Sequence, residues 1–348
     1  MNGFNLSDIT DARLGATTLG SIYLGYTKLW PLATDYSREY LTIESLADNN
    51  TISWFLSDGN YGINKTIAWS TDKTNWTSVT SHYSSPGRTI TTLNTGDKIY
   101  LKGTNTQLSK GSAYCKFNST GNYNVYGNIM SLLYGDNFIG QTTLPSATYN
   151  FYSIFRSSKV VDASNLILPA TTLTDYCYAY MFMGCTALTS APLTLPATTL
   201  ADRCYESMFD GCTALTSAPL TLPATTLADR CYGDMFYGCT SLTTAPELPA
   251  TTLANSCYNE MFCDCTSLTT APELPATTLA SYCYQNMFYG CTSLSYIKCL
   301  ATNISEISGL INWVSKVAST GTFVKPSSMT SWPTGSNGIP SGWTVVNI

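Results

Sequence analysis

The sequence predicts an α+β protein of several domains, in which an antiparallel β-sandwich precedes a short solenoid of repeats and a C-terminal cap. Similar segments recur at intervals of 27, 27, 26 and 26 residues, starting at Cys177, Cys204, Cys231, Cys257 and Cys283. A sixth, degenerate copy starts near Tyr152, and an alternating apolar pattern precedes it. One unit of this length cannot bury its apolar face alone, so neighbouring units must stack.

The composition changes along the chain indicate four segments. We expect a docking segment or arm over residues 1–33 and the sandwich over residues 34–145. The solenoid, with about six repeats, follows over residues 146–295, and the cap over residues 296–348. An N-terminal strand that completes the sandwich is an equally good interpretation of residues 1–33.

Strands are predicted in the sandwich wherever alternating apolar runs lie between turn residues. The predicted strands are 41–45, 52–56, 66–70, 89–93, 98–102, 113–118 and 123–129. Five aromatic residues of this region could form a platform for sugar stacking, although burial is the better expectation for any one of them. They are Trp54, Tyr61, Trp69, Trp76 and Tyr83.

Each repeat is predicted to hold one helix and one short parallel strand. The apolar positions of one repeat follow a helical stripe, and a glycine stands where that helix would end. The stripe is Leu200, Cys204, Met208, Phe209 and Cys212. Cys263 and Asp264 replace the usual residue pair, so that helix end should differ slightly. In the cap we expect a helix over 304–317 and strands over 321–325 and 342–348.

The composition excludes several classes of partner. Charged residues make up 11% of the chain, the net charge is −5, and no basic block exists to bind nucleic acid. No run reaches the ~18 apolar residues that a membrane span needs, so we expect no membrane insertion. The N-terminus lacks the pattern of a secretory signal, so we expect none in the chain.

Eleven of the thirteen cysteines fall in the five clear repeats. Cys204 and Cys212 would lie about 12 Å apart along a helix, whereas a disulfide needs Cα atoms within ~7 Å. We therefore predict reduced, buried cysteines that form ladders through the core. The group Cys257, Cys263 and Cys265 lacks both a histidine and metal-ligand spacing, so no metal site is expected.

No catalytic or cofactor motif is present. His82 is the single histidine, and the sequence has no nucleophile elbow, phosphate loop or dinucleotide fingerprint. Paired carboxylates for glycoside hydrolysis stay open, because such residues can converge from distant positions. We predict a protein that is not an enzyme and needs no cofactor.

The positions that differ most between repeats are the candidates for ligand binding. We expect them on an outward, convex face, although neutral variation of solvated residues would look the same at any single position. They include Tyr176, Tyr180, Arg203, Glu206, Arg230, Asp234, Asn255, Glu260, Tyr282 and Gln285. The alternative binding surface is the strand face, with Ser190, Ser217, Thr244, Thr270, Glu247 and Glu273.

The repeated Met-Phe-x-Gly-Cys-Thr-Ser/Ala-Leu motif, followed by Ala-Pro-x-Leu-Pro, resembles the BspA-like leucine-rich repeats of Bacteroidales surface proteins over residues 151–295. This resemblance implies a right-handed leucine-rich-repeat arc, a role in adhesion or recognition, and no catalytic residues. Residues 22–31 are similar to short segments in structural proteins of gut Bacteroides phages.

Virion proteins assemble in the host cytoplasm and need no export signal, so these resemblances and the expected lack of a secretory signal favour a phage tail or head-fibre component that binds a host-surface glycan or protein. Its place would be the virion, with residues 1–33 contacting other virion proteins. The alternatives are a bacterial cell-surface adhesin and a purely structural virion part. A homo-oligomer is possible, but no heptad pattern predicts a coiled coil.

Overall fold

The computed structural model describes residues 13–14, 17–18, 22–24, 27–30, 35–57, 64–111 and 113–348. The chain divides into two compact units, Met1–Tyr36 and Ser37–Ile348. In the first unit, β1 (Arg13–Leu14) pairs antiparallel with β2 (Thr17–Thr18). A second antiparallel pair joins β3 (Ile22–Leu24) to β4 (Thr27–Trp30). The 3-10 helix η2 (Tyr36–Arg38) follows.

The second unit begins with two sheets. The larger sheet has the order β14-β13-β5-β10-β7-β8, and the smaller has the order β11-β12-β6-β9. The strands are β5 (Leu41–Ser45), β6 (Asn50–Leu56), β7 (Thr66–Ser70), β8 (Thr77–Thr80), β9 (Arg88–Leu93), β10 (Lys98–Lys102), β11 (Ser109–Lys110), β12 (Ala113–Ser119) and β13 (Tyr123–Asn128).

All seven predicted strands are present, with ends that agree within two residues. The prediction missed β8, whose side chains are exposed except for Val79. It also missed β11, which has only two residues. Neither strand shows the repeated alternation on which a sequence-based assignment depends.

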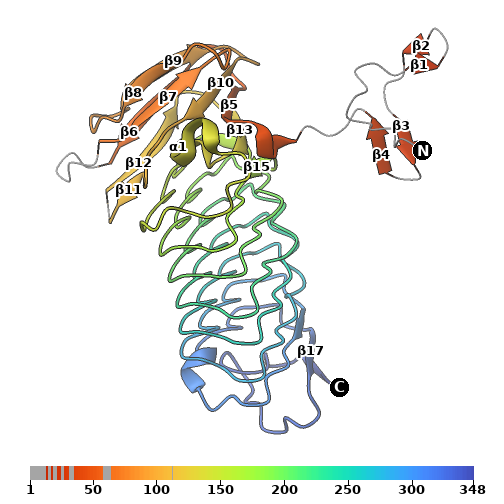
Figure 1. Cartoon of the computed structure of the whole chain (residues 1–348). Helices are drawn as coiled ribbons and strands as arrows, with labels where there is room; N and C mark the ends of the chain where they lie inside the picture. Colours follow the sequence, from red (N-terminus) through yellow and green to blue (C-terminus); the bar gives the residue numbers. More distant parts are fainter. Residues whose placement is uncertain are drawn as a thin grey trace, which may run out of the picture. The chain divides into compact units, whose positions relative to one another are not determined.

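Alternate side chains of both sheets point into one hydrophobic core. Ile43 and Ile99 come from the larger sheet, and Trp54 and Phe117 from the smaller, all four fully buried. The rings of Trp54 and Phe117 lie 4.7 Å apart. The short helix α1 (Ser131–Tyr134) and the 3-10 helix η4 (Gly135–Asn137) then lead the chain toward the repeats (Figure 1).

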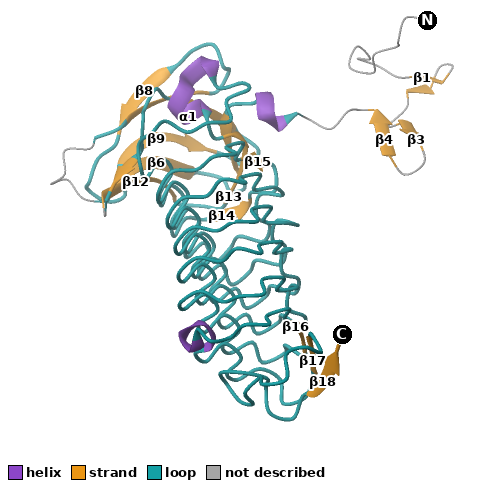
Figure 2. Ribbon diagram, turned by 60° about the horizontal axis from the view of Figure 1, so that its bottom comes forward, coloured by secondary structure: helices purple, strands orange, loops and turns teal. Residues whose placement is uncertain are grey.

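The first repeat extends the larger sheet directly. Strand β13 pairs in parallel with β14 (Val160–Asp162) and with β15 (Leu166–Ile167). Phe117 of the smaller sheet stacks on Phe155 of the repeat at 5.8 Å. The core of the sheets therefore continues without a break into the repeats, which stack as successive coils beneath them (Figure 2).

The predicted repeat helices are wrong. The segments that follow the repeat cysteines are chains of turns, and α1 is the single α-helix of the described residues. Alternate N–H groups donate within the coil and to the next coil: Met208 N donates to Tyr205 O at 3.2 Å, and Phe209 N to Met235 O at 2.9 Å. Every fourth residue has a positive φ, as at Arg203, Ser207 and Gly211.

Backbone geometry, and not the spacing of the apolar residues, separates these coils from helices. The large buried apolar residues recur every four positions and include tyrosines omitted from the predicted stripe: Cys204, Tyr205, Met208, Phe209 and Cys212. At 3.6 residues per turn this set would also lie on one face of a helix, about 140° wide. The positive φ at every fourth residue, as at Ser207 and Gly211, interrupts any continuous right-handed helix.

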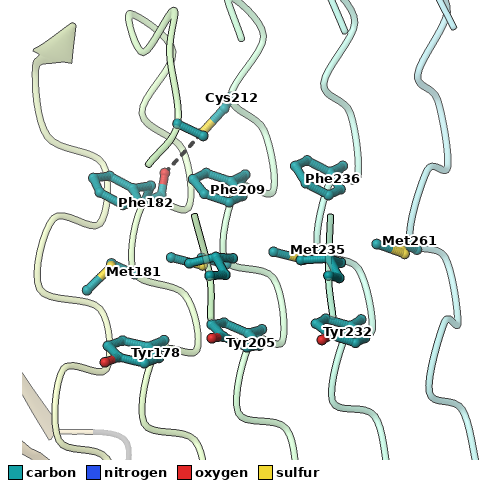
Figure 3. Close-up of a cluster of buried hydrophobic side chains, with 14 of the residues drawn as sticks. Tyr178, Met181, Phe182, Tyr205, Phe209, Cys212, Tyr232, Met235, Phe236 and Met261 are labelled. Carbon is teal, nitrogen blue, oxygen red and sulfur yellow. Dashed lines mark hydrogen bonds between the residues drawn. The ribbon is translucent and has the colours of Figure 1, made fainter. Parts of the chain in front are cut away.

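Equivalent core residues stack from coil to coil (Figure 3). Phe209 lies 5.6 Å from Phe182 and 5.4 Å from Phe236, with nearly parallel rings. The second cysteine of each coil donates its thiol hydrogen to a backbone carbonyl of the preceding coil, as from Cys212 Sγ to Phe182 O at 3.2 Å. All thirteen cysteines are buried, which confirms the predicted burial of the repeat cysteines.

In the middle repeats the predicted strand is reduced to isolated parallel bridges, such as Ser190 with Ser217, whereas the first and last repeats form the strands β14 and β16 (Tyr296–Lys298). A proline follows both Ser190 and Ser217 two positions later. Because proline has no N–H to donate, the ladder stops there. Asp264 keeps the backbone of the repeat glycines, with φ of 58° and the same hydrogen bond to the next coil, so the expected difference there is absent.

The C-terminal segment forms one more coil instead of the predicted helix over 304–317. It contains only the 3-10 helix η5 (Ile307–Leu310). Trp313 continues the aromatic columns, 6.2 Å from Tyr284 and 6.3 Å from Phe288, and stacks on Trp332 at 6.0 Å. The two predicted terminal strands are present as β17 (Thr322–Lys325) and β18 (Thr344–Asn347), parallel to β16 (Tyr296–Lys298). No helix in the described part of the chain has the length and apolar character of a membrane span.

Candidate functional site

One face of the coils carries the side chains that differ between repeats. The positive-φ position before the first core cysteine is Tyr176, Arg203, Arg230, Ser256 and Tyr282 in successive coils, each with φ between 51° and 55°. The backbone is thus constant while the chemistry of the side chain changes. We call this set, with the ten predicted binding residues, the variable face.

A buried carboxylate organises the middle of the variable face. Glu206 is 2% exposed, and its Oε1 accepts hydrogen bonds from Arg203 Nη1 and Arg230 Nε, both at 2.9 Å. Arg230 Nη2 continues the network to Asp234 Oδ2 at 3.2 Å. Glu206 Oε2 has no hydrogen-bond partner in the described structure. The sequence placed Glu206 outward, but its side chain lies under the two arginines.

The acidic residues of this face are perturbed by burial. Burial, and then the nearby Glu260, raise the pKa of Asp234 to about 7, although Arg230 opposes the shift. Burial likewise raises the pKa of Asp210 to about 6, against the opposing effect of Arg156. The protonation of both carboxyl groups therefore changes near neutral pH.

An aromatic cluster occupies the first coils. Tyr176 stacks on Tyr149 at 4.7 Å, and Tyr152 meets Tyr180 edge-on at 5.2 Å. The guanidinium of Arg156 lies 5.7 Å from the ring centre of Tyr180 and 5.6 Å from that of Tyr114 on β12. The guanidinium of Arg203 lies 5.7 Å from the ring of Tyr176, which links this cluster to the Glu206 network.

Five residues of this face were not among the predicted binding residues: Tyr114, Tyr149, Tyr152, Arg156 and Asp210. Tyr149, Tyr152 and Arg156 belong to the degenerate first repeat, and aligning that repeat with the others would have identified their positions. Asp210 occupies an outward position that also varies between repeats. Tyr114 comes from the sandwich, so no repeat pattern could have indicated it.

The remaining predicted residues of the variable face lie farther along the coils and pair locally. The backbone N–H of Asn255 donates to Asp229 Oδ1 at 3.0 Å, and Asn286 Nδ2 donates to Glu260 Oε1 at 3.2 Å. Gln285 Oε1 accepts from Asn259 Nδ2 at 3.3 Å. Tyr282 is 45% exposed. These residues do not join the Glu206 network through any of the hydrogen bonds in the described structure.

The alternative strand face contains a groove of about 480 Å³. Glu247 and Glu273 line it together with four prolines. Glu273 is paired with Lys298 at 2.8 Å. Ser190, Ser217, Thr244 and Thr270 do not line this groove.

The predicted aromatic platform of the sandwich does not assemble. Trp54 is fully buried, whereas Tyr83 is 62% exposed and stacks on His82. Trp76 packs edge-on against Tyr40 at 5.1 Å. Tyr61 lies outside the described residues. Within the described residues, no ring contact joins two members of the predicted set. This holds for Trp69 as well.

Among the residues that the structure describes, no three His, Cys, Asp or Glu side chains are grouped to hold a metal ion. His82 Nδ1 is hydrogen-bonded to the Ser84 hydroxyl at 2.6 Å and belongs to neither surface.

Comparison with known proteins concerns the coils. No curated protein and no solved structure matches the chain. Residues 206–312 match the family described as BspA type leucine rich repeat region, in six copies. This part of the chain is therefore similar to BspA-type leucine-rich repeats, within a β-rich fold with very few helices.

Proposed function

We propose that the chain is a non-enzymatic recognition protein that binds a surface glycan or protein through the variable face. The observation that carries the proposal is the contrast within each coil: the inward positions repeat Cys, Tyr, Met, Phe and Cys, whereas the outward positions change from Tyr to Arg to Ser on one backbone. Tyrosine and arginine are also the residues most enriched at binding hot spots.

The match to BspA-type repeats supports a surface adhesion or recognition role. We infer a phage tail or head-fibre component that is located in the virion. This finer assignment rests on the similarity of residues 22–31 to phage structural proteins. In this role, residues 1–33 attach the chain to other virion proteins, and the partner of the coils is a host-surface glycan or protein. A bacterial surface adhesin is the second candidate, favoured by the same repeats.

The test is binding of the purified chain to intact Bacteroidales cells. One variant changes Tyr176, Arg203, Arg230 and Tyr282 to Ser, because Ser256 already occupies this backbone position. The same variant carries Glu206→Ala, since Ala179 stands at the equivalent position and an unpaired buried carboxylate would destabilise the fold. Circular dichroism confirms folding before binding is measured.

A matched control carries Glu247→Ala and Glu273→Ala in the groove of the alternative face. We expect the variable-face variant to lose binding and the groove variant to keep it. The reverse result would move the site to the strand face, and retention of binding by both variants would contradict recognition through the coils. Loss of binding on periodate-treated cells would identify the ligand as a glycan.

A further inference from the structure

A polar pocket of about 360 Å³ lies on the sandwich, away from the variable face. It is formed where β7, β8 and β10 meet the segment that follows α1. Register places Lys102, Ala68 and Ser78 in one row across these strands. The volume is within the range of small-molecule sites, which starts at roughly 300 Å³.

Two glycines, Gly103 and Gly135, contribute to the lining of this pocket. A Cβ atom on Gly103 would lie 2.8 Å from Leu132 O and 2.9 Å from Asn105 Nδ2, so a larger residue there would displace these neighbours. Gly135 has a φ of 57°, which L side chains rarely adopt. The fully buried side chain of Ile67 adds an apolar surface to the lining.

Several polar groups of the lining have no partner within the described structure. Three side chains of the lining form no side-chain hydrogen bond within the described structure: the hydroxyls of Ser78 and Thr104 and the amide of Asn137. These groups supply both donors and acceptors. They are therefore available to a ligand that carries several hydroxyl groups.

The charged groups of the pocket neutralise each other. Lys102 Nζ donates to Asp136 Oδ1 at 2.7 Å, and the hydroxyl of Tyr40 donates to the same oxygen at 2.7 Å. The hydrogen bond from Lys102, and then that from Tyr40, lower the pKa of Asp136, so the ion pair persists at neutral pH. The ammonium also lies 4.0 Å from the ring centre of Trp76. Neither charge is left to attract an ionic ligand.

We propose that this pocket binds a neutral sugar residue, held by the hydroxyls of Ser78 and Thr104, the amide of Asn137 and the exposed edge of the Lys102–Asp136 pair. The site is separate from the variable face. It would give the chain a second contact with a glycan, independent of recognition through the coils.

The experiment titrates the full chain with methyl glycosides of mannose, galactose and N-acetylglucosamine, followed by saturation-transfer NMR and calorimetry. Methyl glucuronide serves as the charged probe. Asn137→Ala removes one ligand group, and we expect about a tenfold loss of affinity, equivalent to one hydrogen bond. Ser78→Trp places a large ring in the pocket and should abolish binding. Ser78 is exposed on the edge strand β8, a position that tolerates aromatic residues.

Thr71→Ala, an exposed change outside the lining, and the variable-face variant should bind as the unchanged chain does. The proposal is overturned if none of the neutral glycosides binds, if binding survives Ser78→Trp, or if the glucuronide binds more tightly than the neutral sugars. Loss of glycoside binding in the variable-face variant alone would also overturn it, by assigning the sugar to the coils. Repeating the titration with the same sugar on a soluble polymer distinguishes a free sugar from a glycan terminus.

Discussion

The sandwich and the coils share one hydrophobic core but organise their backbones differently. In the sandwich, long strand pairs satisfy the backbone and side chains alternate between the core and solvent, as along β10. In the coils, regular secondary structure is nearly absent, and each buried side chain instead stacks on its equivalents above and below. The comparison shows that stacking of identical side chains can replace strand pairing as the interaction that fixes the backbone conformation.

The largest expected effect is the loss of one ring from the phenylalanine column. Phe209→Ala removes contacts with both Phe182 and Phe236 and leaves a cavity that the neighbouring coils cannot fill. We expect a loss of about 3–5 kcal/mol in the free energy of unfolding, measured by denaturant titration. Hydrogen exchange should increase in the adjacent coils more than in β5 and β10. A loss below about 1 kcal/mol would contradict the role of stacking.

The same comparison explains what the sequence could predict. In the sandwich, apolar and polar residues alternate along each strand, and this pattern can be read from the strand's own residues. The ends of β5, β7 and β10 were therefore predicted correctly. In the coils, Cys204, Met208 and Cys212 lie four residues apart, a spacing that fits a helical stripe as well as a chain of turns. The spacing therefore could not distinguish the two conformations. The burial of Glu206 depends on arginines from two coils, and a contact of that kind has no signal within one repeat.

The second prediction concerns pH, because the coils bury carboxyl groups that the sandwich keeps at its surface. Burial raises the pKa of Asp234 to about 7 in the folded protein, above its ordinary value of 3.8. The folded state therefore binds a proton that the unfolded state has already lost between these two values, so stability falls as pH rises toward 7. Asp234→Asn removes this cost.

We expect Asp234→Asn to stabilise the chain by about 3 kcal/mol at pH 8.5 relative to its effect at pH 5. Thermal melts at both values measure the difference. Asp136→Asn in the sandwich is the matched control, since hydrogen bonds from Lys102 and Tyr40 lower the pKa of Asp136. That change should destabilise the chain at neutral pH. Equal effects of Asp234→Asn at pH 5 and pH 8.5 would contradict the burial of a charged carboxylate.

A smaller effect is expected from the left-handed backbone of the coils. Ser256 has a φ of 53°, a conformation that costs a non-glycine residue roughly 1–2 kcal/mol. Ser256→Gly relieves this strain but increases the entropy of the unfolded chain by a smaller amount. We expect a net stabilisation of about 0.5 kcal/mol. Ala254→Gly, two residues earlier and without a positive φ, should destabilise by about as much or more. Equal shifts for the two variants in denaturant titrations would argue against strain.

The smallest effect separates stacking from hydrogen bonding. Tyr232 is fully buried in the tyrosine column, 5.7 Å from Tyr205, yet its hydroxyl has no hydrogen-bond partner in the described structure. Tyr232→Phe keeps the ring and removes the unsatisfied hydroxyl, so the free energy of unfolding should be unchanged or slightly higher. In the sandwich, Tyr40→Phe removes the hydrogen bond to Asp136 and should cost about 1 kcal/mol. If Tyr232→Phe destabilised the chain as much as Tyr40→Phe, the coils would depend on the hydroxyl and not on the stacked ring alone.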